Sequence, residues 1–290
     1  MLTTGIDPIQ QEIMDALKVL HAFNPSAEIV RRTTFLADQL IEHDKHSLVL
    51  GISGGVDSLV AGYLAQHAAE QTKGHGRQAD FIALRLPYGI QSDEEAAQRA
   101  LKLIGPHRIL TIDIKPVADA MLQQLRDAGL TFENAYQEDF ILGNIKARQR
   151  MIAHYSVAGA TNGLVVGTDH AAEALMGFFT KFGDGAADVT PLYGLNKHQV
   201  QQLALAFGAP EDMAYKVPTA DLETLAPGKP DEEALGVSYE QIDDFLSGKP
   251  VDEQARERIV ERYRATTHKR GLPNDPYMTP PRDRMSIPSS

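Results

Sequence analysis

Short apolar segments with strand character alternate along the chain with longer segments that have helical periodicity. The four predicted strands span residues 47–52, 81–86, 108–114 and 163–167, and the predicted helices among them span 57–71, 92–103, 117–128 and 140–158. Helical crossovers of this kind connect parallel strands. The alternation therefore predicts an α/β fold with a doubly wound parallel sheet, in three layers with helices on both faces. Ligands of such folds bind beyond the carboxyl ends of the strands.

The rest of the chain is predicted to be helical with one long irregular segment. Helices are expected at 7–22 and 26–43 before the first strand, and at 196–207, 238–247 and 252–269 after the last one. Residues 208–236 are rich in proline, glycine and acids, which is typical of a mobile loop. We expect one domain over residues 1–275 and a flexible tail rich in proline and serine over 276–290.

Composition excludes several classes of function. The formal net charge of −11 disfavours a nucleic-acid partner. No apolar run reaches the roughly 18 residues that a membrane span needs, so no membrane partner is expected. The absence of cysteine excludes disulfides, thiolate metal sites and cysteine nucleophiles. The first residues lack the pattern of a signal peptide, and we therefore predict a cytoplasmic location.

A glycine-rich loop follows the first predicted strand and opens the next helix. It reads Ser53-Gly54-Gly55-Val56-Asp57-Ser58. Glycines let backbone N–H groups approach an anion closely, and a helix N-terminus adds partial positive charge. Because Asp57 would repel phosphate directly, a divalent cation such as Mg²⁺ is expected between them. The plain alternative is a strand-to-helix turn that Ser53 caps.

This loop resembles the pyrophosphatase-type loop of enzymes that split ATP into AMP and pyrophosphate. The second half of the chain resembles the NAD synthetase family in particular, and the match covers about residues 10–275 in the same motif order. Val56 is a departure, since many relatives carry glutamine there. The resemblance implies a Rossmann-like, adenine nucleotide alpha hydrolase-like fold. The segments that carry it are 143–148, 167–173, 179–185, 191–197, 218–223 and 267–270.

The resemblance also implies a two-step reaction, the last step of NAD biosynthesis. The nicotinate carboxylate of deamido-NAD attacks the α-phosphorus of ATP, which releases pyrophosphate and leaves an adenylated substrate. Ammonia then displaces AMP and forms NAD. Glutaminase domains use a cysteine nucleophile, so this chain resembles the short, ammonia-dependent form. Family members are homodimers with the dinucleotide site at the interface, and the 140–158 helix is a candidate interface element. The alternative is that its apolar stripe packs within one subunit.

Site residues carry over from the family position by position. The metal ligands for Mg²⁺ would be Asp57 and Glu173, and the catalytic residues would be Asp57 and Asp184. The dinucleotide contacts would be Arg148, Lys181, Asp188, His268 and Lys269. The ATP contacts would be Gly51, Ile52, Ser53, Gly54, Gly55, Val56, Asp57, Ser58, Arg85, Gln91, Thr168, Lys197 and Thr219.

Most of these residues also have a simpler interpretation. Glu173 suits the start of any helix, and Thr168 suits a strand end. Lys197 would otherwise be a solvated surface lysine, and Asp184 lies between glycines where an ordinary turn is equally expected. Arg148 stands on the otherwise apolar stripe 141, 145, 148, 152 and 155, where it requires a partner or reaches the rim of the protein.

Two rival functions remain open from the sequence. The first is another adenylating enzyme with the same loop, such as a tRNA-thiolating or a different amidating enzyme. The acidic charge and the absent cysteines argue against thiolation. The second is a non-catalytic sensor of adenine nucleotides, which would not require the paired acids Asp57 and Glu173.

Overall fold

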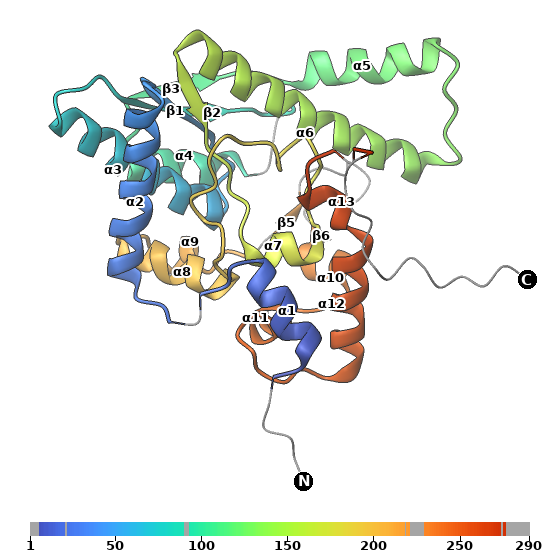
Figure 1. Cartoon of the computed structure of the whole chain (residues 1–290). Coiled ribbons are helices and arrows are strands. Elements are labelled where there is room, and N and C mark those ends of the chain that lie inside the picture. Colours follow the sequence, from blue (N-terminus) through green and yellow to red (C-terminus); the bar gives the residue numbers. More distant parts are fainter. Residues whose placement is uncertain are drawn as a thin grey trace, which may run out of the picture.

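A four-stranded parallel sheet forms the centre of the protein, as the alternation predicts (Figure 1). The computed structural model describes residues 6–20, 22–89, 93–217, 231–273 and 275–276, and the backbone alone of 219–220 and 229–230. The strands are β1 (Ser47–Gly51), β2 (Asp80–Arg85), β3 (Arg108–Thr111) and β4 (Gly163–Val165). Their order is β3-β2-β1-β4, and Val49 of β1 pairs with Ile82 on one side and Val165 on the other. The chain thus reverses its direction of winding beside β1, where the glycine loop begins.

Helices cover both faces of the sheet, because successive strand residues point to opposite sides. Leu48, Leu50 and Phe81 pack against α2 (Pro25–Glu42), α3 (Val56–Gly74), α4 (Glu94–Ile104) and α8 (Lys197–Ala206). Val49 and Ile82 face α6 (Ala135–Ala160), and α5 (Lys115–Asp127) packs against α6 on that side. The predicted fold class, a three-layer doubly wound sheet, is confirmed.

A third group of helices packs beyond β4 around its own apolar cluster (Figure 1). Leu175, Phe245 and Ile259 lie at its centre and are almost completely buried. This cluster fixes the short helix after β4 against the C-terminal helices. Its members are α1 (Pro8–Ala16), α7 (Ala171–Met176), α10 (Asp231–Leu235), α11 (Tyr239–Leu246) and α12 (Glu253–Ala265), and α13 (Thr267–Arg270) follows α12 directly.

Several predicted boundaries are wrong for local reasons. The helix expected at 7–22 ends at Ala16, and Lys18 beyond it has a φ of +54°, which a helix does not accommodate. α6 starts at Ala135, because the side chain of Asn134 accepts a hydrogen bond from the Gln137 backbone and caps the helix. The 3-residue strand β4 and the 4-residue strand β3 are shorter than expected.

Parts of the segment 208–236 form regular structure, although residues 218 and 221–228 lie outside the described residues. It contains α9 (Glu211–Ala214), the antiparallel pair β5 (Thr219–Ala220) and β6 (Lys229–Pro230), and the whole of α10. The tail predicted at 276–290 lies outside the described residues, apart from residue 276. Within the described ranges, the helices are all too short or too polar to cross a bilayer.

Candidate active site

A pocket of about 360 Å³ opens at the carboxyl ends of β1, β2 and β4, where the fold class predicts a ligand. This volume falls within the range of small-molecule sites. One wall is the glycine loop and the first turn of α3, and another is α6 through Ala147, Arg150, Met151 and His154. Glu173, Asp184 and Lys197 line it from the far side, so that predicted residues from both halves of the chain meet here.

The glycine loop has the geometry of an anion-binding turn. Gly54 has a φ of +86°, and a Cβ there would lie 2.7 Å from the backbone nitrogen of Ala97, so only glycine fits. Gly55 is the N-cap of α3 and has no side chain to satisfy the first N–H groups of the helix. Ser58 Oγ donates to the Gly55 carbonyl at 3.0 Å and lies 3.2 Å from Ser53 Oγ. Among the described residues, no side chain caps the first turn of α3, which lies beside the pocket.

Arg85 lines the pocket, but its guanidinium is already engaged. One end donates to Glu94 Oε2 at 2.6 Å, and the other donates to the carbonyl of Ile52. The residue is only 3% exposed, so it connects the glycine loop to the start of α4 from beneath. These two bonds use two of the five guanidinium N–H donors, and the buried Nε has no hydrogen-bond partner among the described residues.

Three ionisable side chains form a compact cluster at the loop. Asp57 of α3 and Glu173 of α7 both approach His170, whose Nε2 lies 3.4 Å from Asp57 Oδ1 and 3.8 Å from Glu173 Oε1. One potential ligand atom from each of the three lies within 4.8 Å of the others. His170 is completely buried and lies outside the pocket lining, whereas both carboxylates reach the pocket. The two carboxylates are hard oxygen donors of the kind that Mg²⁺ prefers.

Lys197 belongs to the same cluster and brings a positive charge next to Asp57. Its Nζ donates to both oxygens of Asp57, at 2.9 and 2.8 Å, and the side chain is almost completely buried. Burial works to raise the pKa of Asp57, but the Lys197 ammonium and His170 together outweigh it and hold that pKa well below its usual range. Burial and the Asp57 carboxylate raise the pKa of Glu173 well above its ordinary value. The interpretation of Lys197 as a solvated surface lysine is thereby wrong.

Asp184 lies across the pocket on the loop that follows α7. Its Oδ1 accepts a hydrogen bond from the Thr180 backbone at 3.0 Å, which is a turn contact, and the side chain stays open to the pocket. Dense surrounding protein raises the pKa of Asp184. Burial and the charge of Asp184 raise the pKa of Asp169 to about 7. The expected turn is therefore present, and the side chain that forms it also lines the pocket, while the catalytic role of Asp184 stays a prediction.

The predicted dinucleotide residues gather around this same loop. Arg148 is exposed on α6 and donates to the carbonyl of Lys181 at 3.3 Å, while the ammonium of Lys181 donates to the carbonyl of His268. Lys269 Nζ donates to the carbonyls of Gly177 and Phe179 at 2.9 and 2.8 Å. These groups therefore bind backbone in this structure.

Asp188 has a partly structural position at the edge of the sheet. Its Oδ2 accepts from the Val165 backbone of β4 at 2.8 Å, and its Oδ1 lies 3.5 Å from the Tyr155 hydroxyl of α6. The stripe around Arg148 is not buried as a whole within the chain, because Ile145 is 8% exposed but Ile152 is 50% exposed.

The remaining predicted contacts have mixed outcomes. Thr168, Gly51 and Ile52 line the pocket, and their contact with ATP stays a prediction. Gln91 and the side chain of Thr219 lie outside the described residues.

Several pocket residues were missed from the sequence. Lys216 Nζ donates to the Gly54 carbonyl at 3.3 Å, and Arg150 Nε donates to the Leu86 carbonyl at 3.1 Å. His154 packs against Gly51, where a Cβ would lie 2.7 Å from its Nε2. Arg150 and His154 are one helical turn apart, so a second stripe on the 140–158 helix was the available signal. Lys216 lies in the proline-rich segment, where the sequence contains no signal that marks it as a pocket residue.

The chain is similar to known proteins over most of its length. The model of the NAD synthase family matches residues 28–273. A protein from Streptomyces coelicolor described as an NH(3)-dependent NAD(+) synthetase is 59% identical over 268 residues, which is 92% of this chain and 97% of that protein. One with the same description from Paraburkholderia phytofirmans is 54% identical over 279 residues, with coverage of 96% and 98%.

Solved structures are also similar to this chain over most of its length. The NAD+ synthetase from Burkholderia pseudomallei has a TM-score of 0.80 at 52% identity and covers 93% of this chain and 99% of its own. An NMN synthetase from Francisella tularensis has a TM-score of 0.77 at 36% identity, with coverage of 89% and 100%. A family match over most of the length, together with relatives more than half identical, establishes that the chain belongs to the NAD synthase family.

Proposed function

We propose that this protein is an ammonia-dependent NAD synthetase, which amidates deamido-NAD at the expense of ATP and releases AMP and pyrophosphate. The observation that carries the proposal is the meeting of three features in one pocket. They are the open N-terminus of α3, the Asp57–Glu173 carboxylate pair and the buried Lys197. Together they suit a nucleotide triphosphate that arrives with a divalent cation.

The loop and Lys197 would hold the phosphates of ATP. Backbone N–H groups of the first turn of α3 bind the departing pyrophosphate, and the Lys197 ammonium adds a positive charge beside it. Asp57 and Glu173 would hold Mg²⁺, which neutralises the triphosphate when it is bound. Arg85, Thr168, Gly51 and Ile52 shape the wall next to the nucleotide, and Gln91 and Thr219 are proposed as further contacts.

Asp184 would serve the amidation step. A carboxyl group with a raised pKa, next to a second carboxyl at Asp169, suits the binding of ammonium and the acceptance of a proton. Ammonia then attacks the acyl carbon of the adenylated nicotinate, the bond to AMP breaks, and the proton lost from nitrogen passes to Asp184. The protein otherwise positions the reactants and stabilises charge.

The dinucleotide would lie along Arg148, Lys181, Asp188 and His268, around the loop that carries Asp184. We further propose a homodimer in which α6 contributes to the interface. Phe140, Ile152 and Tyr155 are 50%, 50% and 37% exposed on this one helix, and a dimer interface at α6 would cover them. The cytoplasmic location stays a prediction from the sequence.

One assay tests the function directly. The purified protein is incubated with ATP, Mg²⁺, deamido-NAD and ammonium, and NAD and AMP are measured. We expect both products in equal amounts, with glutamine unable to replace ammonium. ATP converted to ADP, or no product without a tRNA, would contradict the proposal and favour another adenylating enzyme. Binding of ATP without any turnover would favour a sensor.

A second arm defines the acyl substrate. Nicotinate mononucleotide replaces deamido-NAD at the same concentration, because one similar solved structure is described as an NMN synthetase. We expect the dinucleotide to be strongly preferred. Equal or better use of the mononucleotide would reassign the substrate while leaving the adenylation and amidation chemistry intact.

A further inference from the structure

Lys269 is half-buried, and its ammonium binds backbone carbonyls instead of lining the pocket. Its ammonium donates to the carbonyl of Gly177 at 2.9 Å and to the carbonyl of Phe179 at 2.8 Å, and it lies 5.5 Å from the centre of the Phe179 ring. An ammonium has three N–H donors, and these two bonds leave one. Two of the three donors of Lys269 are thus engaged by backbone carbonyls in the ligand-free protein.

The two carbonyls belong to the segment that leads to Asp184. Gly177 ends α7 with a φ of +59°, and a Cβ there would lie 2.3 Å from the Thr266 side chain, so the end of α7 is pressed against the end of α12. Arg270, next to Lys269, donates to the Ala174 carbonyl at 2.9 Å. The last carbonyls of α7 thus receive two cations from α13, as helix C-termini favour.

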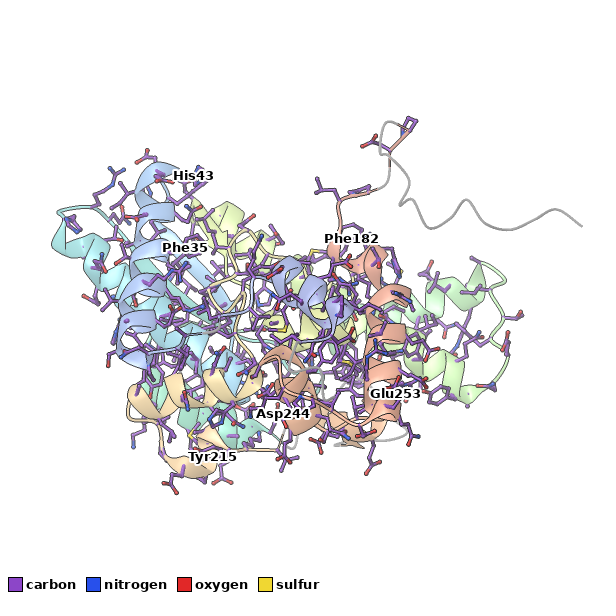
Figure 2. All side chains as sticks on the ribbon, turned by 60° about the horizontal axis from the view of Figure 1, so that its bottom comes forward. Phe35, His43, Phe182, Tyr215, Asp244 and Glu253 are labelled. Atoms are coloured by element: carbon purple, nitrogen blue, oxygen red, sulfur yellow. The ribbon has the colours of Figure 1, made fainter. Side chains whose placement is uncertain are left out.

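The path continues from Phe179 to Asp184 by direct contacts. The Phe179 ring lies over Gly185, where a Cβ would lie 2.4 Å from Phe179 Cδ2. Thr180 follows Phe179, and its backbone N–H donates to Asp184 Oδ1 at 3.0 Å, while its carbonyl accepts from the Gly183 and Gly185 backbones. Phe182, in the same turn, has a φ of +60° and is 56% exposed at the surface (Figure 2). The turn is closed by these internal bonds, and the Phe179 carbonyl just before it is one of the points that tie it to the rest of the protein, together with Thr180 Oγ1 bound to Asn144 and the Lys181 carbonyl bound to Arg148.

We propose that Lys269 is a positioning residue, which fixes the 178–185 loop through the Gly177 and Phe179 carbonyls and thereby sets the place of Asp184. The role differs from the dinucleotide contact that the family resemblance implies for this position. It rests on the proposed function, because the reaction gives the position of Asp184 its importance. The charge of Lys269 also acts on Asp184 directly and opposes the rise in the pKa of that carboxyl.

The two roles predict opposite kinetics for Lys269→Met. A positioning role lowers kcat by about tenfold or more, because small displacements of a reacting group are costly, and leaves KM for deamido-NAD within about twofold. A substrate contact instead raises KM for deamido-NAD by about tenfold with kcat unchanged. Lys269→Arg, which keeps donors for both carbonyls, should recover most of kcat. Lys102→Met, at an exposed position of α4, serves as the matched control.

Amide hydrogen exchange of the ligand-free protein tests the clamp without any reaction. In Lys269→Met we expect the amides of residues 178–186 to exchange about tenfold faster. Exchange of the amides of α7 and of the sheet should be unchanged. Unchanged exchange in that loop, or a rise in KM for deamido-NAD without loss of kcat, overturns the proposal. If the methionine variant unfolds, Lys269→Gln keeps two uncharged N–H donors on a shorter side chain and is expected to give an intermediate kcat; a wild-type kcat would overturn the proposal. A wild-type protein that made no NAD would refute the proposed function and leave the exchange result valid.

Discussion

Glu173 is predicted to destabilise the ligand-free protein, so that Glu173→Gln makes the fold more stable while it weakens metal binding. The ligand atoms of Asp57, His170 and Glu173 lie within 4.8 Å of one another. Two unit negative charges 4.8 Å apart repel by about 3.5 kcal/mol at an effective dielectric constant of 20. Lys197 offsets part of this repulsion, because its charge also acts on Glu173. We expect the amide variant to gain about 1–2 kcal/mol, or about 2–4 °C in Tm.

The stability difference between Glu173→Gln and the wild-type protein should depend on pH. The pKa of Glu173 is raised in the folded state above its ordinary value of 4.5. The folded protein therefore binds a proton at Glu173 more tightly than the unfolded chain, and this favours folding at low pH and is lost as the pH rises through the folded-state pKa. The stability advantage of Glu173→Gln should be absent near pH 4.5 and largest above the folded-state pKa. Thermal melts in EDTA from pH 4.5 to pH 8.5 measure this difference directly.

A bound ligand should reverse the order of the melting temperatures of the wild-type protein and Glu173→Gln. At 100 times its Kd, a ligand adds about 2.7 kcal/mol to the stability of the form that binds it. With saturating ATP and Mg²⁺ we expect the wild-type protein to melt above Glu173→Gln. Glu133→Gln, on an exposed turn, controls for the loss of one charge. A ligand-free Glu173→Gln that melts below the wild type at pH 8 would refute the reasoning, since it would mean that this carboxylate makes net favourable contacts.

Three further changes test other parts of the pocket. Gly54→Ala should lower the free energy of unfolding by about 1–3 kcal/mol in urea, because its φ of +86° and the nearby Ala97 backbone leave no room for a Cβ; an unchanged midpoint would contradict this. Lys197→Met should tighten Mn²⁺ binding to the nucleotide-free protein by calorimetry, because Lys197 no longer occupies both Asp57 oxygens; an equal Kd would be evidence against that competition. Asp184→Asn keeps an oxygen for the Thr180 N–H, so it should lower kcat with KM for ATP unchanged, and a normal kcat would exclude Asp184 as the proton acceptor.

The fold was predictable because its signals are local. Each strand is a short apolar run, and each glycine or capping residue acts within a few positions of itself. Gly54 and Gly55 could be assigned to a loop at the start of α3 without knowledge of any other segment. The order of the strands in the sheet, β3-β2-β1-β4, was not read from the pattern, although the parallel class was.

The pairings across the site could not be predicted by the same means. Lys197 and Asp57 are separated by 140 residues, and nothing near either of them shows that they form an ion pair. Lys269 illustrates the same limit, because the basic run at 268–270 suits a helix C-terminus or a substrate phosphate equally well. Its actual partners are two carbonyls about 90 residues earlier, which contribute no side-chain signal to the sequence.

Two carboxylates of the pocket, Asp57 and Glu173, are compensated to different degrees. Asp57 and Glu173 are alike in chemistry and lie close together, but Lys197 donates to Asp57 alone. One carboxylate is therefore neutralised and the other is not, and their pKa values move in opposite directions. The ligand-free site is left with one poorly compensated acid, and a divalent cation brought by a nucleotide would relieve it. We infer that the cluster favours the metal and the nucleotide together, because the phosphates then provide Lys197 with a replacement for the carboxylate that the metal takes.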